Sequence, residues 1–198
     1  MGKRKQFDEE QVLSNIADYF WKHGYAATKV DKLSVLTGLT KTSIYNAYGN
    51  KEALFNKAID YYVERELTKR FAFLDMKKAM SDNIEILLNQ LFLANNNDKL
   101  TYGCLLTNSI VELAGDEPTL HEIANKHLDN VRANMYYFFS DYLSNNKLAN
   151  NTDINKLTDF FMTNMQGLRV QSRIRGADTT LANSIDLLLN YFRSLELN

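Results

Sequence analysis

Apolar residues recur at helical spacing along almost the whole chain, and this pattern constrains the fold more than any other feature. In the first segment Val12, Ile16 and Phe20 follow one another at four-residue intervals, which places them on one helix face. A single proline and eight glycines in 198 residues leave few breaks between such segments. Sandwiches and barrels of short strands need many more turn residues. The sequence therefore predicts an all-α fold with about nine helices.

Capping residues predict where the first helices begin and end. The first helix follows Asp8 and stops at Gly24, because acidic residues suit a helix start and glycine suits a helix end. Thr28 and Asp31 have the spacing of a capping box that opens a second helix. Gly38 ends that helix. Three short helices are therefore expected within about 50 residues.

Longer helices are predicted beyond residue 50. Their expected spans are residue 51 to the low seventies, 81–92 (opened by Ser81 or Asp82), 104–114, 118–143, 153–176 and 179 to near the C-terminus. A polar loop is expected at residues 95–98. This pattern predicts a small helical domain over residues 1–52 and a larger helical domain over residues 53–198.

Charge is unevenly distributed between these two parts. Residues 1–57 hold nine Lys/Arg and six Asp/Glu, whereas the remaining residues hold 14 and 18, and the whole chain has a net charge of -1. A mildly basic head on a mildly acidic body is typical of a polyanion-binding unit joined to a unit with another task. One cysteine excludes an internal disulfide. With no apolar run of about 20 residues and no signal peptide, a cytoplasmic protein is expected.

A glycine-containing turn at residues 37–40 separates two of the short helices, as in a helix-turn-helix. The helix after the turn, residues 41–47, needs only Ile44 and part of Tyr45 for its inward side. Its other residues are small, polar or cationic, and a helix of this kind can read base edges in the major groove. Spacing alone leaves two interpretations open, a DNA-reading helix or a solvated surface helix.

Residues 28–34 (TKVDKLS) and 37–55 (TGLTKTSIYNAYGNKEALF) resemble the N-terminal domain of TetR-family transcriptional regulators. The similarity covers roughly residues 8–58 and combines the turn, the Ile44-Tyr45 pair, the aromatic Tyr48 and the Lys-Glu-x-Leu sequence that starts at Lys51. The resemblance implies a homodimer, an operator in double-stranded DNA, and a C-terminal domain that binds a small effector.

Side-chain chemistry and the resemblance together predict the DNA contacts. Candidates for contacts to bases are Lys41, Thr42, Ser43 and Asn46, and candidates for contacts to phosphates are Thr28, Lys29, Tyr45, Tyr48 and Lys51. Thr42 stands where the family often has glycine, and Ala47 where it often has His or Tyr, so the operator sequence cannot be transferred from relatives. Lys3, Arg4 and Lys5 form either a DNA-binding arm or a solvated tip.

The last two predicted helices carry apolar residues on more than one side. The resemblance implies that they pair with the same helices of a second chain, and the alternative is a helix enclosed within a monomer. The helices over residues 81–176 are expected to surround the effector. The candidate lining consists of Phe92, Cys104, Asn108, Tyr136, Tyr137, Met162, Met165 and Gln166, each of which also fits an ordinary core or surface position. Cys104 is either a reactive thiol at a helix start or core filler.

Enzyme signatures are incomplete. His121 and His127 lie six positions apart, not the four that would place both imidazoles on one helix face to bind zinc. The segment after Gly38 resembles a phosphate-binding loop, but Leu33 stands in place of the upstream glycine. The sequence therefore predicts a ligand-responsive dimeric repressor with no catalytic residues, cofactor or metal. The alternatives are an activator, an electrophile sensor that uses Cys104, and a helical small-molecule-binding protein or enzyme without a DNA role.

Overall fold

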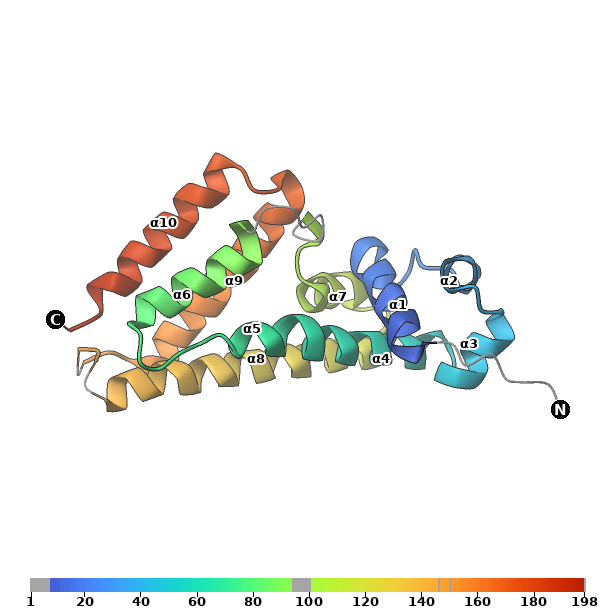
Figure 1. Cartoon of the computed structure of the whole chain (residues 1–198), viewed down its shortest axis with the longest axis horizontal. Coiled ribbons are helices and arrows are strands. Elements are labelled where there is room, and N and C mark those ends of the chain that lie inside the picture. Colours follow the sequence, from blue (N-terminus) through green and yellow to red (C-terminus); the bar gives the residue numbers. More distant parts are fainter. Residues whose placement is uncertain (1–7, 94–100, 146, 150, 198) are drawn as a thin grey trace.

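The computed structural model describes residues 8–93, 101–145, 147–149 and 151–197, and these form an elongated all-helical molecule (Figure 1). The elements are α1 (Glu9–His23), α2 (Val30–Thr37), α3 (Lys41–Tyr48), α4 (Lys51–Tyr62), η1 (Val63–Thr68), α5 (Lys69–Phe71), α6 (Met80–Leu88), η2 (Asn89–Leu93), α7 (Leu105–Leu113), α8 (Pro118–Ser144), α9 (Ile154–Arg175) and α10 (Thr179–Ser194). The two η segments are π-helical and continue the helices before them. Merged in this way, the elements of the described residues give nine helices, which confirms the predicted class and number.

Local sequence explains most of the helix ends. Asp8, Thr40, Asn50, Asp153 and Asp178 each accept a hydrogen bond from a backbone N–H in the first turn of the helix that follows. Glycines follow the C-terminal ends of α1, α2, α3 and α9 with positive φ angles, a conformation that glycine adopts without steric cost.

Two predicted caps are wrong. Thr28 does not cap α2, because its hydroxyl donates to the carbonyl oxygen of Gly24 instead. Ser81 lies inside α6 and does not open it, and both its backbone N–H and its hydroxyl donate to the carboxylate of Glu196 near the C-terminus. The Thr28 hydroxyl thus bonds backward to a carbonyl four residues earlier, whereas Ser81 bonds to a side chain 115 positions away.

The long helices connect the two ends of the molecule. The head, made of α1, α2 and α3, occupies one end, and α6, α9 and α10 lie at the other (Figure 1). The continuous helix α4–η1–α5 and the 27-residue α8 run lengthwise between them. No helix in the described part of the chain is long and apolar enough to cross a membrane.

Buried side chains form two hydrophobic cores. The first combines the head with α4, η1, α7 and the start of α8, and the second combines α6, η2, the rest of α8, α9 and α10. Packing therefore continues from the head into α7 and α8, and the division at residues 52/53 stays a prediction. The predicted loop at residues 95–98 and the basic residues Lys3, Arg4 and Lys5 lie outside the described residues.

Candidate functional site

Helix α3 projects from the head with both of its ends fixed. Thr40 Oγ1 accepts from the Ser43 N–H at 3.1 Å and lies 2.9 Å from the Ser43 hydroxyl oxygen. Gly38 adopts the left-handed conformation, with φ 69° and ψ 8°, in the turn between α2 and α3. The Ser34 hydroxyl of α2 closes this turn by donating to the Leu39 carbonyl oxygen. These contacts hold the first turn of α3 in one orientation relative to α2.

The two faces of α3 differ sharply. Ile44 and Tyr48 are buried in the head, whereas Lys41, Thr42, Tyr45, Asn46 and Ala47 are exposed and Ser43 is half-buried. Lys41 forms an ion pair with Asp31 of α2. The structure thus gathers five of the predicted contact residues, Lys41, Thr42, Ser43, Tyr45 and Asn46, on the first two turns of one helix.

Two predicted phosphate contacts occupy interior positions. Thr28 is 1% exposed, and its hydroxyl is engaged by Gly24. Tyr48 is 3% exposed, and its buried hydroxyl has no hydrogen-bond partner within the described part of the chain. Burial raises the Tyr48 pKa, and Glu9 adds to this effect, so the hydroxyl stays neutral. Aromatic and hydroxyl-bearing residues in this region suggested polar contacts, but packing of the short helices requires them as core.

Lys51 stands at the start of α4, next to the exposed end of α3. Its ammonium nitrogen lies 4.3 Å from the centroid of the Tyr25 ring. Partial burial lowers the Lys51 pKa, while Glu112 and Glu117 act in the opposite direction. Lys51 is therefore a half-buried cation held against an aromatic face. Lys29, by contrast, is exposed at the start of α2.

A carboxylate on α7 binds the head directly. Glu112 accepts from the backbone N–H of Tyr25 at 3.0 Å and of Ala26 at 2.8 Å, in the loop between α1 and α2. Gly24 makes room for this contact, because a Cβ atom there would lie 2.6 Å from the Glu112 Oε2. Sequence analysis missed Glu112, since no local pattern marks a residue that bonds to backbone groups 86 and 87 positions away.

A small cavity of about 60 Å³ lies in the body between α5, α6, α7, α8 and α9. Its walls are mostly apolar, and its polar members are Arg70, Cys104, Thr107, Gln166 and Arg169. The N-terminal residues of α7 therefore line this cavity, while Glu112 near the other end of the same helix binds the head. Helix α7 and the α4–η1–α5 helix both run from the cavity to the head.

Family comparisons agree with this arrangement. A family described as bacterial regulatory proteins, tetR family, matches residues 12–58, and a family described as tetracyclin repressor-like, C-terminal domain, matches residues 82–188. The second match alone covers more than half of the chain. The chain belongs to the TetR family. The first match spans most of α1 to α4, and the second spans α7, α8 and α9 with most of α6 and part of α10.

Individual relatives of this TetR-family chain are distant in sequence. The HTH-type transcriptional repressor ComR of Escherichia coli (strain K12) is 25% identical over 87% of this chain and 82% of ComR. A TetR-family regulator from Cytophaga hutchinsonii superimposes with a TM-score of 0.83 at 20% identity, covering all of both chains. CifR, solved as a cysteine mutant with a 26-base-pair operator duplex, gives a TM-score of 0.85 at 21% identity, covering 98% of this chain and 100% of CifR. These two structural similarities establish a common fold.

The predicted effector residues of this TetR-family body divide into two groups. Cys104, Met162, Met165 and Gln166 line the cavity. Phe92, Asn108, Tyr136 and Tyr137 are not among the lining residues. The Phe92 ring packs against the Arg169 guanidinium, and Asn108 donates to the Tyr102 carbonyl oxygen. Tyr136 packs against the body core, whereas Tyr137 is exposed. Helical spacing identified the correct helices but did not determine which side of each faces the cavity.

Arg70 and Arg169 are the functional candidates that sequence analysis missed in the TetR-family body. The sequence could have identified Arg169 as a candidate, because it lies four residues after Met165 on an otherwise apolar face of α9. Arg70 lies next to the π-helical segment η1, whose wider turns change the face on which each residue falls. The direction in which the Arg70 side chain points therefore could not be predicted from the sequence.

Proposed function

We propose that the protein is a dimeric, ligand-responsive transcriptional repressor that binds a palindromic operator in double-stranded DNA. The observation that carries this proposal is the solvent-facing side of α3, where Thr42, Tyr45 and Asn46 lie exposed on a helix whose ends are fixed. The description of ComR as a repressor and the operator bound to CifR support the same assignment. The protein acts by binding and has no catalytic role, and it works in the cytoplasm, where its DNA is.

Within the proposed complex α3 lies in the major groove. Thr42, Ser43 and Asn46 contact bases, and Lys41 reaches them after releasing Asp31. Tyr45, Lys29 and Lys51 contact phosphates and set the register of the helix in the groove. Thr28 and Tyr48 support these residues from the core of the head, since their side chains are buried.

The second chain of the dimer packs on α9 and α10. Large apolar residues of these helices that remain exposed are Phe160, Val170, Ile174, Leu187 and Tyr191. Leu187 is 71% exposed, and Phe160 and Tyr191 pack together with ring centroids 4.8 Å apart. Exposed apolar patches of this kind mark interaction surfaces, and a two-fold axis lets the patch cover its own copy.

Effector binding in the cavity releases the operator. A cavity of about 60 Å³ is far smaller than the ~300–1,000 Å³ of pockets that hold drug-sized ligands. An effector must therefore enlarge it and move the surrounding helices, two of which lead to the head. Such a ligand stabilises the state in which the two α3 helices no longer match the groove repeat, so operator and effector weaken each other's binding equally.

Selection of bound sequences from random duplex DNA with the purified protein tests the proposal. We expect a pseudo-palindrome whose half-sites lie about 34–36 Å apart, or a multiple of that distance. Recovery of no preferred sequence, or of a single unrepeated site, would contradict a dimeric operator-binding regulator. A helical binding protein without a DNA role would give the first of these results.

A further inference from the structure

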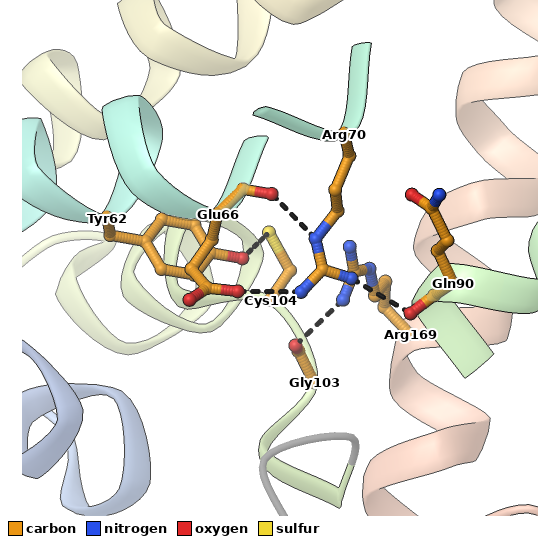
Figure 2. Close-up of polar contacts among 7 residues, drawn as sticks. All are labelled: Tyr62, Glu66, Arg70, Gln90, Gly103, Cys104 and Arg169. Carbon is orange, nitrogen blue, oxygen red and sulfur yellow. Dashed lines mark hydrogen bonds and ion pairs between the residues drawn. The ribbon is translucent and has the colours of Figure 1, made fainter. Parts of the chain in front are cut away.

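Arg70 and Arg169 both line the cavity of the body, and their guanidinium groups lie close together (Figure 2). Arg169 of α9 is 8% exposed, donates to the Gly103 carbonyl oxygen at 3.2 Å, and lies 5.2 Å from the centroid of the Phe92 ring. Arg70 of α5 donates to the Glu66 carbonyl oxygen, to the Glu66 carboxylate and to the Gln90 carbonyl oxygen, at distances of 2.6, 2.6 and 3.0 Å. Both cations are thus fixed by backbone carbonyl groups rather than free to turn toward solvent.

The charges of these groups do not balance. Glu66 forms an ion pair with Arg70, and no carboxylate of the described residues forms one with Arg169. The Tyr62 hydroxyl does not supply a negative charge, because burial, followed by nearby Cys104, raises its pKa well above the usual value despite the opposing effect of Arg169 and Arg70. Among the described residues, one positive charge therefore remains without a carboxylate partner beside an apolar cavity, an arrangement that disfavours the empty state.

The other residues that line the cavity define which further chemical groups a ligand must have. Gln166 and Thr107 offer neutral polar groups, and Cys104 accepts a hydrogen bond from Tyr62 at 3.5 Å. The other lining residues are apolar: Leu67, Phe71, Leu87, Leu91, Leu106, Leu128, Val131, Phe161, Met162 and Met165. A ligand that fits these walls has an apolar body and a single negative charge. A dianion would replace the surplus positive charge with a surplus negative one.

We propose that the cavity binds a small monocarboxylic acid with an aliphatic or aromatic body, whose carboxylate pairs with Arg169. This inference rests on the proposed function, because it names the chemical class of the effector. A planar guanidinium favours a carboxylate through paired N–H donors, and Arg is better suited than Lys to such a partner in an apolar site. The apolar body of the acid lies among the leucine, phenylalanine and methionine side chains.

The same site offers a route from binding to conformational change. Arg70 joins the two π-helical segments, because it bonds to Glu66 within η1 and to Gln90 within η2. Single π-helical turns often mark functional positions in helices. An acid that enlarges the cavity separates these segments, and η1 directly follows α4, which begins at Lys51 shortly after α3.

Calorimetric titration of the full chain without DNA tests the ligand class. The probes are benzoate and hexanoate, each compared with its neutral amide, benzamide or hexanamide. We expect each acid to bind at least about tenfold more tightly than its amide, because a hydrogen-bonded charge pair contributes more than a neutral hydrogen bond. Equal affinities for acid and amide, or no heat from either acid at millimolar concentration, would overturn the proposal.

Two variants test which positive charge is responsible for binding the acid. Arg169→Gln should weaken acid binding about 10–100-fold and leave amide binding unchanged. Arg173→Gln is the matched control, because Arg173 lies one turn further along α9, is exposed, and bonds only to the Tyr102 carbonyl oxygen in the described structure. An acid affinity that survives Arg169→Gln refutes the assignment. If Arg169→Gln fails to fold, as judged by circular dichroism, Arg169→Lys keeps the charge and should retain the preference for acid over amide.

The outcome is separable from that of the proposed function. If DNA selection yields a palindrome and neither acid binds, the ligand class is wrong and the regulator assignment stands. If the acids bind through Arg169 and no DNA sequence is selected, the cavity assignment stands and the operator-binding role fails.

Discussion

The bond between Glu112 and the head loop is predicted to be the main polar tie between α7 and the head. Glu112 accepts two backbone hydrogen bonds, at 3.0 Å from Tyr25 and 2.8 Å from Ala26. Hydrogen bonds to charged groups contribute about 1.5–3 kcal/mol each, and partial solvent access at this loop reduces the contribution to about 1–1.5 kcal/mol each. Glu112→Ala, which removes both bonds, should therefore lower the local stability of the loop by about 2–3 kcal/mol. Glu112→Gln keeps one acceptor oxygen and should lose about half as much.

Amide hydrogen exchange followed by NMR measures this effect at the two donors themselves. A loss of about 2–3 kcal/mol corresponds to exchange of the Tyr25 and Ala26 amides that is faster by about 30–150-fold in Glu112→Ala. Glu117→Gln is the matched control, because Glu117 also acts on Tyr25 and Lys51 through its charge but makes no hydrogen bond to the loop in the described structure. Unchanged exchange in Glu112→Ala, or equal effects of Glu112→Gln and Glu117→Gln, would refute the reasoning.

Lys51→Ala should weaken binding to specific and random duplexes alike and reduce the slope of log affinity against log salt by about one, whereas Thr42→Ala should change preference at particular base pairs. Equal losses for both variants on both duplexes, measured by fluorescence anisotropy, would contradict these separate roles. Leu187→Asp should shift the protein toward monomer in sedimentation experiments, because it places a charge in the proposed apolar dimer surface; an unchanged dimer would remove α10 from the interface. Cys104→Ser should change benzoate affinity by no more than about threefold, since the serine oxygen can also accept the Tyr62 hydrogen bond and such a neutral bond contributes little net free energy. A complete loss of affinity in calorimetry would assign the thiol a direct role in binding.

The head illustrates how much a local pattern can establish. Helix starts at Asp8, Thr40 and Asn50 and stops at Gly24 and Gly38 follow from side chains and backbone freedom within one turn of each position. Apolar spacing likewise identified Ile44 as the inward residue of α3 and the length of the helix that starts at Lys51. The burial of Thr28 and Tyr48 was not predicted, because a polar atom can be buried when tertiary packing requires the rest of the side chain.

The amino-acid sequence by itself determined the helical class, most of the helix ends and the exposed character of α3, because these depend on interactions between residues close in the chain. Only the tertiary structure decided which residues meet across long separations. Arg169 reaches Gly103, Arg70 reaches Gln90, and Glu112 reaches the loop at Tyr25, and no periodicity encodes such pairs. The physical reason is that a helical pattern fixes which face is apolar, whereas the packing of several helices fixes which charged groups end beside one cavity.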